Sequence, residues 1–249
     1  MNSLERISFP APEKSQVWID FDGTISKKDT LDELITRFSI NDSWHELERL
    51  WRENLIGSRE CLEGEFALLR ITKEELNEVL GSMQIDAGLL DILELCEQRS
   101  IPVAVVSDGI DFFIKKILSS NGVFSLVVRS NTAKFVEGRF TLECPHNDPK
   151  CDVKAAHCKC ASMKALGQPG RRNIYIGDGR SDLCPARKAD IVFAKNVLAA
   201  CLKAENIGHI EYTNLGQVAS VLSSAWMPAE ERDDLCVTGT SAELVSETV

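Results

Sequence analysis

The ten residues VWIDFDGTIS, Val17–Ser26, place two aspartates one residue apart at the end of an apolar run. A short apolar run of this kind is typical of a strand that is buried on both faces in a parallel sheet. We therefore predict a first strand over residues 16–20. Asp20 and Asp22 then lie where the strand ends, and in open parallel sheets ligands bind outside the carboxyl ends of the strands.

Two later stretches end in the same way. IPVAVVSDG, residues 101–109, and RNIYIGDGRSD, residues 172–182, are apolar runs followed directly by acidic and small residues. Because parallel strands present their carboxyl ends at one edge of a sheet, we expect polar side chains from all three stretches to share one site. The candidates brought together in this way are Asp20, Asp22, Ser107, Asp108, Asp178 and Asp182.

The rest of the chain divides by its hydrophobic periodicity. Between residues 30 and 99, apolar residues recur three and four apart, which predicts a block of helices. From residue 100 to residue 225 strands and helices alternate, which predicts a doubly wound, Rossmann-like parallel sheet of the α/β class. We expect a catalytic core of residues 1–29 and 100–227, a helical cap of residues 30–99 inserted after the first strand, and a disordered tail at residues 228–249.

The chain has 249 residues, 44% of them apolar, and a formal net charge of -10. This charge argues against a nucleic-acid partner or an anionic membrane surface. No apolar run approaches the roughly 18 residues that span a bilayer, and the N-terminal segment has no apolar stretch of the signal-peptide type, so we expect a cytoplasmic protein. The oligomeric state stays open.

Several carboxylates in one cleft repel one another and need a compensating positive charge. Mg²⁺ is the simplest candidate, because it prefers oxygen ligands and is commonly held by one or two carboxylates and a substrate phosphate. The predicted site has more carboxylates than one metal ion needs, so one aspartate is left to act as a nucleophile and form an aspartyl-phosphate. Turns and helix N-caps also favour aspartate and glycine, which is the alternative interpretation of each stretch taken alone.

Taken together, four features resemble the motifs of the haloacid dehalogenase superfamily of phosphatases. They are DFDGT at residues 20–24, VVSDG at residues 105–109, a lysine upstream of the last motif, and GDGRSD at residues 177–182. The resemblance runs from about residue 15 to residue 225, and its motifs include Thr24 and Gly109. It implies a Mg²⁺-dependent phosphomonoesterase that acts on a small phosphorylated metabolite.

The resemblance also implies a role for each motif residue. Asp20 would attack phosphorus, and Asp22 would protonate the leaving alkoxide and then activate water. Mg²⁺ would be held by Asp20, the backbone carbonyl of Asp22, and Asp178, with Asp182 as a supporting acid. Ser107 would hydrogen-bond the phosphoryl oxygens.

The motifs need a lysine beside the nucleophile, because the transition state of phosphoryl transfer spreads charge over the phosphoryl oxygens. The competing residues are Lys150, Lys154, Lys159 and Lys164. Lys159 begins a predicted helix and lies 19 residues before Asp178, a spacing that matches the related phosphatases. We predict Lys159 in this role, with Lys154 as the second choice.

The helical block is similar to the caps of two groups in this superfamily, phosphoserine phosphatases and the methionine-salvage phosphatases that act on 2-hydroxy-3-keto-5-methylthiopentenyl-1-phosphate. DGIDFFIKKIL, residues 108–118, and CDVKAAHCKC, residues 151–160, look more like the salvage group. Asp29 lies nine residues after Asp20, where phosphoserine phosphatases carry a substrate-binding glutamate, so the resemblance implies a contact with substrate. Glu65 stands where those enzymes place an arginine for the substrate carboxylate, which weakens the phosphoserine interpretation.

Three other functions stay open. A phosphatase for phosphoserine or another small amine phosphate would use the same chemistry. A catalytically silent phosphate-binding protein would be expected to lose a catalytic acid first, whereas Asp20, Asp22, Asp178 and Lys159 are all present. A phosphotransferase such as a mutase would need a cap that excludes water and retains the product.

Four cysteines between residues 144 and 160 raise a separate hypothesis, a structural zinc site. Together with His146 and His157 they offer enough ligands for tetrahedral Zn²⁺, although their spacing matches no standard zinc finger. Buried thiols that pack a loop explain the same residues. The cysteines are Cys144, Cys151, Cys158 and Cys160.

Overall fold

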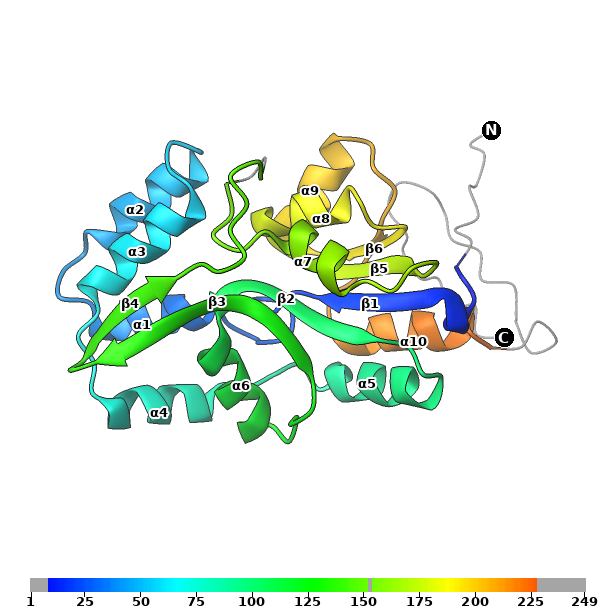
Figure 1. Ribbon diagram of the computed structural model, residues 1–249, viewed down its shortest axis with the longest axis horizontal. Coiled ribbons are helices and arrows are strands. Elements are labelled where there is room, and N and C mark those ends of the chain that lie inside the picture. Colours follow the sequence, from blue (N-terminus) through cyan, green and yellow to red (C-terminus); the bar gives the residue numbers. More distant parts are fainter. Residues whose placement is uncertain (1–8, 152–153, 228–249) are drawn as a thin grey trace.

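The computed structural model describes residues 9–151 and 154–227, which include a seven-stranded sheet with helices on both faces (Figure 1). The strand order is β4-β3-β2-β1-β5-β6-β7. Neighbouring strands are parallel except β3 and β4, which form an antiparallel hairpin. The predicted doubly wound sheet is confirmed. The strands are β1 (Ser15–Ile19), β2 (Val103–Ile110), β3 (Val127–Val136), β4 (Arg139–Glu143), β5 (Arg172–Gly177), β6 (Ile191–Ala194) and β7 (Ile210–Glu211).

Strand β1 lies at the centre of the sheet. The strands that follow it in the chain first extend the sheet on one side, from β2 to β4, and then on the other side, from β5 to β7. Strand β1 pairs with β2 on one side and with β5 on the other, so that Ile19 lies opposite both Val105 and Ile176. All five residues of β1 are buried, as is typical of a strand covered on both faces. This register brings the carboxyl ends of three strands together, and the predicted site residues leave the sheet at this point.

Helices cover both faces of the sheet, with α7, α8 and α9 on one face and α5, α6 and α10 on the other (Figure 1). The side chains of β1 alternate between the two resulting cores: Val17 and Ile19 belong to the larger and Trp18 to the smaller. No helix among the described residues is long and apolar enough to cross a membrane. The helices are α1 (Thr30–Phe38), α2 (Trp44–Arg52), α3 (Ser58–Leu68), α4 (Lys73–Ser82), α5 (Gly88–Gln98), α6 (Asp111–Ser120), α7 (Lys159–Leu166), α8 (Leu183–Ala186), α9 (Asn196–Ala204) and α10 (Leu215–Ala225), with short 3-10 helices at Pro12–Lys14 and Arg180–Asp182.

An aromatic cluster joins the cap helices to the sheet. Helix α3 packs on strand β4, where the ring centroids of Phe66 and Phe140 lie 5.2 Å apart. Phe140 also contacts Phe113 of α6 and Phe135 of β3. Because this cluster is built from both the cap and the core, it holds α3 in place next to the strand ends.

Helix α5 packs against α10 on one face of the sheet (Figure 1). Their closest approach is at Gly88, where an added Cβ would lie 2.0 Å from the backbone nitrogen of Gly216. The hydrophobic periodicity of residues 30–99 groups α5 with the cap helices, because such a pattern predicts that a helix forms but not which element the helix packs against. We propose that the cap ends before α5 and that α5 belongs to the core. The predicted tail, residues 228–249, lies outside the described residues.

Replacing Gly88 by alanine is expected to destabilise the protein by about 2 kcal/mol or more, because the new methyl group meets backbone rather than a movable side chain. Urea unfolding measures the change. Gly208→Ala is the matched control, since an added Cβ there meets nothing within 4 Å. Equal stability of the two variants would contradict the packing of α5 on α10.

Candidate active site

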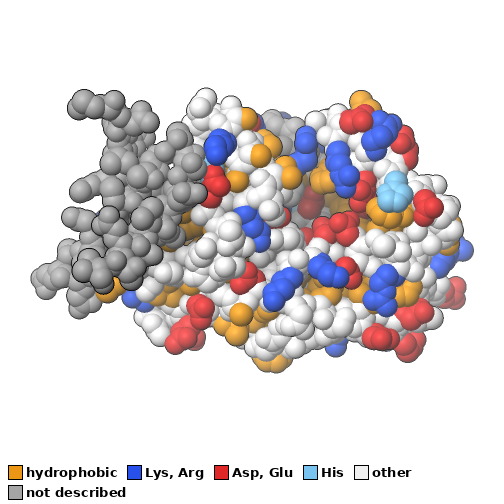
Figure 2. All heavy atoms as spheres, turned by 180° about the vertical axis from the view of Figure 1, so that it is seen from behind, with side chains coloured by type: hydrophobic (Ala, Val, Ile, Leu, Met, Phe, Trp, Pro, Cys, Tyr) orange, Lys and Arg blue, Asp and Glu red, His pale blue; other side chains and the backbone are white. Residues whose placement is uncertain are grey.

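The ends of β1, β2 and β5 open into a cavity of about 270 Å³. The strand ends line one side of the cavity, and helices α1, α2 and α3 line the other. Figure 2 shows acidic side chains in a central hollow on one face of the molecule. The residues predicted from sequence that line the cavity are Asp20, Asp22, Asp29, Ser107, Asp108, Gly109 and Asp178.

Lys159 forms a buried bridge between two aspartates. Its Nζ lies 2.7 Å from Oδ1 of Asp20 and 2.6 Å from Oδ1 of Asp182, and it also donates to Oγ of Ser181 at 2.9 Å. Lys159 is 2% exposed and Asp20 is 5% exposed. Of the four lysines that compete for the role, Lys159 lies in this site, whereas the others are exposed. Those exposed lysines are Lys150, Lys154 and Lys164.

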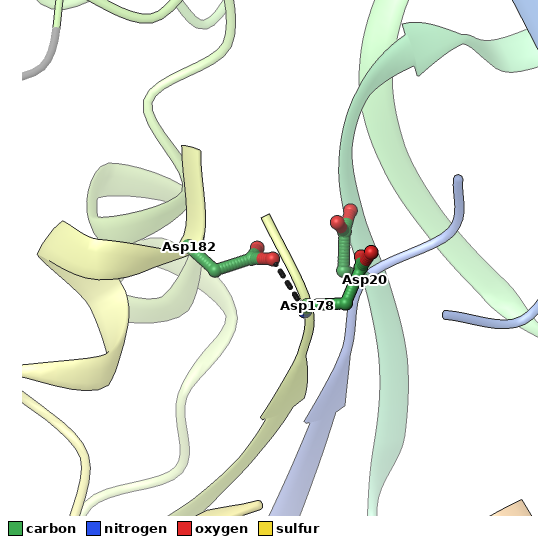
Figure 3. Close-up of side chains that lie close together, drawn as sticks. All are labelled: Asp20, Asp178 and Asp182. Carbon is green, nitrogen blue, oxygen red and sulfur yellow. Dashed lines mark hydrogen bonds between the residues drawn. The ribbon is translucent and has the colours of Figure 1, made fainter. Parts of the chain in front are cut away.

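The carboxylate of Asp182 is fully occupied by donors. Its Oδ1 accepts from Lys159 and from the hydroxyl of Tyr175 at 2.5 Å. Its Oδ2 accepts from the backbone N–H groups of Asp178 at 2.9 Å and Gly179 at 2.8 Å, and the first of these bonds is drawn in Figure 3. Asp182 therefore fixes Lys159 and the turn after β5, and it has little capacity left to bind a metal ion.

The charges of this group are not balanced by the protein alone. Burial would lower the pKa of Lys159, but Asp182 and Asp20 raise it above its ordinary value. Burial would raise the pKa of Asp182, but Lys159 holds it below its ordinary value. For Asp20, burial and then the charge of Asp182 keep the pKa well above its ordinary value despite Lys159. The single positive charge of Lys159 thus cannot balance the charges of both Asp20 and Asp182.

Asp20 and Asp178 fit a divalent cation. Carboxylate oxygens of Asp20, Asp178 and Asp182 lie within 4.8 Å of one another, and Figure 3 shows the three side chains converging from two strand ends and the following turn. Burial, and then Asp182, raises the pKa of Asp178. Because the oxygens of Asp182 are occupied, the carboxylates of Asp20 and Asp178 are the ones that would hold the metal, and the ligand predicted from the backbone carbonyl of Asp22 stays a prediction. A hard cation with oxygen ligands suits such a site.

The turn after β1 is shaped to bring Asp178 close. Oγ1 of Thr24 donates to Oδ1 of Asp178 at 3.0 Å. Gly23 has a φ of 72°, and a Cβ there would lie 2.5 Å from Oδ2 of Asp178. A side chain at this position would both strain the backbone and displace the carboxylate, which is why the predicted motif needs glycine.

Asp22 is held by the first residue of α1. Its Oδ1 accepts from the backbone N–H of Thr30 at 2.8 Å and from the Thr30 hydroxyl at 2.5 Å. Burial raises the pKa of Asp22, although the bonds from Thr30 oppose this. A carboxyl group with a raised pKa and one oriented oxygen is suited to transfer protons. Sequence reasoning missed Thr30, because no local pattern connects it to Asp22.

Ser107 and Gly109 complete the wall beside Asp22. Ser107 is 1% exposed, and its Oγ accepts from the backbone N–H of Gly109 at 2.9 Å. A Cβ on Gly109 would lie 2.7 Å from Oδ2 of Asp22 and 3.1 Å from Oγ of Ser107. Because Gly109 has no side chain, the side chains of Asp22 and Ser107 have room to lie at the cavity wall.

The cap side of the cavity is acidic. Asp29 caps α1 by accepting from the backbone N–H groups of Leu31 and Asp32. Asp32, Glu48 and Glu65 follow on α1, α2 and α3. Burial, and then Glu48, raises the pKa of Glu65 to about 8. These carboxylates face the reacting end of the cavity from the opposite wall.

Among the described residues, the four cysteines of the predicted zinc site do not gather into one group of ligand atoms, although the side chains of Cys158 and Cys151 contact each other. Cys160 Sγ lies 3.0 Å from Sγ of Cys184, a residue outside the predicted set. In the described part of the chain, the group of three or more acidic, histidine or cysteine ligands is the aspartate group of the active site. The four predicted cysteines are free thiols, and the zinc hypothesis gains no support.

The fold is the one that the resemblance to the haloacid dehalogenase superfamily of phosphatases implies, and the chain is a phosphatase. Residues 16–207, more than three quarters of the chain, match the family described as Putative Phosphatase, and the chain belongs to this family.

Relatives agree with this assignment. The chain is 25% identical to a 2-hydroxy-3-keto-5-methylthiopentenyl-1-phosphate phosphatase of Brevibacillus brevis, over 84% of this chain and 96% of the relative. It is 28% identical to the enzyme of the same name from Exiguobacterium sp., over 84% and 97%.

Solved structures share the fold. A substrate-bound phosphoserine phosphatase has a TM-score of 0.62 at 20% identity and covers 84% of this chain and 98% of its own. A HAD family hydrolase from Salmonella enterica serovar Typhi has a TM-score of 0.63 at 22% identity and covers 84% and 70%. Both share the fold of this chain over most of its length.

Gly109→Ala is expected to lower turnover at least about tenfold with little loss of stability, because the methyl group displaces the Asp22 carboxylate. Steady-state kinetics and thermal unfolding measure the two quantities. Gly208→Ala again serves as the control, and wild-type turnover by Gly109→Ala would show that this close approach does not matter to the reaction.

Glu65→Gln is expected to stabilise the protein increasingly as the pH rises. In the folded state Glu65 keeps its proton up to about pH 8, whereas in the unfolded chain it titrates near 4.5. The wild type therefore loses stability through Glu65 as the pH rises between these values. Relative to wild type, the variant should gain roughly 2 kcal/mol or more between about pH 5 and about pH 9.

Urea unfolding at several pH values measures this gain. Glu63→Gln, at an exposed position of the same helix, is the control and should show no comparable pH dependence. A Glu65→Gln stability that runs parallel to wild type at every pH would contradict the raised pKa.

Proposed function

We propose that this phosphatase hydrolyses a small phosphorylated metabolite through an aspartyl-phosphate on Asp20, with Mg²⁺ bound by Asp20 and Asp178. The observation that carries the proposal is the buried Lys159, which holds one oxygen of Asp20 at 2.7 Å at the end of the cavity. Such a lysine stabilises both the ionised nucleophile and the incoming phosphoryl oxygens. We also propose a cytoplasmic location, consistent with the free thiols of the described residues.

In the first step the free oxygen of Asp20 attacks phosphorus, and the bond from phosphorus to the leaving oxygen breaks. Asp22 gives its proton to that oxygen, and the alcohol departs. In the second step Asp22 takes a proton from water, whose oxygen attacks the aspartyl-phosphate and releases inorganic phosphate. Ser107 donates to a phosphoryl oxygen during both steps, and the positive charge of Lys159, whose three N–H donors are engaged by Asp20, Asp182 and Ser181, stabilises the phosphoryl group through its field. Bound Mg²⁺ would supply charge stabilisation for the phosphoryl group.

For the substrate we propose 2-hydroxy-3-keto-5-methylthiopentenyl-1-phosphate. Support comes from the names of the relatives, which match this chain over most of both lengths at 25% and 28% identity. The cavity of about 270 Å³ has room for a small phosphomonoester. Its cap wall also carries apolar surface from Leu62 and Trp51, against which a short thioether chain can pack.

A second candidate is a phosphomonoester that carries an amine. The acids of the cap wall, Asp32, Glu48 and Glu65, favour it, because a substrate ammonium group would favour the ionised form of these carboxyl groups and pair with it. Arg52 pairs with Glu48 at the edge of this group. Phosphoserine is less suited than a simple amine phosphate, since Glu65 offers no positive charge to its carboxylate. A silent binding protein or a mutase has no comparable observation in its favour.

Release of inorganic phosphate from a panel of phosphomonoesters tests both candidates. The panel contains the methylthiopentenyl phosphate, phosphoserine and phosphoethanolamine, each with Mg²⁺ or with EDTA. We expect selective, Mg²⁺-dependent turnover of the first. Asp20→Asn should lower it by roughly a thousandfold or more, because the nucleophile is lost. Asp91→Asn, an exposed aspartate of α5, is the control.

The outcomes separate the chemistry from the substrate. Turnover of phosphoethanolamine in preference to the others, lost in Asp20→Asn, would keep the chemistry and assign the acidic cap wall to amine recognition. Turnover that persists in EDTA or in Asp20→Asn would contradict the proposed mechanism.

A further inference from the structure

Asp108 follows the phosphoryl-binding Ser107, yet its carboxylate is directed at the protein. Its Oδ1 accepts from the backbone N–H of His157 at 2.6 Å, and its Oδ2 accepts from the hydroxyl of Ser58 at 2.7 Å. Its backbone carbonyl accepts from Nδ2 of Asn131 at 2.6 Å, and Asn131 is completely buried. One residue thus contacts the cap, strand β3 and the loop before α7.

Ser58 is the residue of the cap that contacts Asp108. It is the first residue of α3 and is 6% exposed. While its hydroxyl donates to Asp108, its Oγ accepts from the backbone N–H of Ala156 at 2.6 Å. Its own backbone N–H donates to the carbonyl of Lys154 at 3.1 Å. The N-terminus of α3 is therefore bonded to both Asp108 and the loop 154–157.

The loop leads directly to the lysine that holds the nucleophile. The backbone N–H groups of Ala156 and His157 donate to Ser58 and Asp108, respectively. These two residues lie three and two positions before Lys159. Gly57 permits this close contact, since a Cβ there would lie 2.9 Å from the carbonyl oxygen of Lys154. A shift of α3 away from the core would release the backbone that leads to Lys159.

We propose that Asp108 is a positioning residue that couples the seating of the cap to the placement of Lys159. When α3 is seated, Ser58 and Asp108 together fix the backbone of residues 156 and 157, and Lys159 Nζ meets Asp20. When α3 moves away, these bonds are lost and the lysine loses its support. The kinetic consequence rests on the phosphatase chemistry proposed above, whereas the structural coupling does not.

Two variants remove the same bond from its two ends. Ser58→Ala removes the hydroxyl, and Asp108→Asn replaces the oxygen that accepts from Ser58 while the remaining oxygen still serves His157. Each variant should lower kcat roughly tenfold and change KM by less than about threefold, since a buried partner is left unsatisfied beside the loop. The double variant should be no worse than about Ser58→Ala alone, because Ser58→Ala already lacks the bond that Asp108→Asn removes, in addition to the bond from Ala156.

Two controls separate this role from plain stability. Ser58→Thr keeps the hydroxyl and should retain most of the wild-type kcat. Ser119→Ala removes an exposed hydroxyl that donates to the carbonyl of Lys116 within α6, and it should leave kcat unchanged. A lower unfolding temperature for Ser58→Ala with wild-type kcat would overturn the proposal, as would losses in the two single variants that multiply in the double variant.

Hydrogen exchange tests the coupling without any substrate. In Ser58→Ala and in Asp108→Asn, amides of residues 57–61 and of residues 155–162 should exchange faster together, while those of β1 and β5 keep their wild-type rates. Faster exchange in the cap segment alone would overturn the coupling. If the wild type turns over no substrate of the panel, the proposed substrates fail, and this exchange pattern still decides the role of Asp108.

Discussion

The structure depends on one buried ammonium group. Lys159 Nζ lies between the carboxylates of Asp20 and Asp182, and all three side chains are shielded from water. These residues come from the start of α7, the end of β1 and the turn after β5. Removing one partner of such a buried group leaves an uncompensated charge, which typically costs about 3–5 kcal/mol. The interaction therefore fixes the site and also joins the segments that form it.

The rest of the site depends on which hydrogen bonds the carboxylate oxygens of Asp182 and Asp20 already accept. Asp182 uses both of its oxygens for Lys159, Tyr175 and the backbone of residues 178 and 179. Asp20 gives one oxygen to Lys159, which leaves the other for chemistry. With a net charge of -10, the protein must attract an anionic phosphate by local positive charge. Lys159 provides part of that charge, and the geometry of Asp20 and Asp178 fits a metal ion that would provide the rest.

Much of this arrangement can be predicted from sequence, because it follows from local pattern and sheet topology. Apolar runs that end in Asp20, Ser107 and Asp178 predict parallel strands, and parallel strands bring their carboxyl ends together. The spacing between Lys159 and Asp178 singles out the lysine that the structure places against Asp20. These features need no knowledge of how helices pack.

Contacts between distant segments could not be predicted in this way. Thr30 holds Asp22, and Ser58 holds Asp108, through bonds that depend on how the cap lies on the core. Helix α5 has the same periodicity as the cap helices but packs on α10. The number of cysteine and histidine ligands between residues 144 and 160 suggested a zinc site, whereas packing places Cys160 against Cys184. In each case the deciding partner lies outside the local sequence pattern: Thr30 is eight residues from Asp22, and the other partners are farther away.

The most direct test of the account is to identify the atom that receives the phosphoryl group. Wild-type protein would be mixed with a turned-over phosphomonoester and Mg²⁺, quenched rapidly in acid, digested, and examined by mass spectrometry for phosphorylated peptides. The account predicts a phosphoryl group on Asp20, absent from Asp20→Asn treated in the same way. Phosphate release during which no phosphorylated Asp20 can be trapped, or a phosphoryl group on another residue, would contradict it.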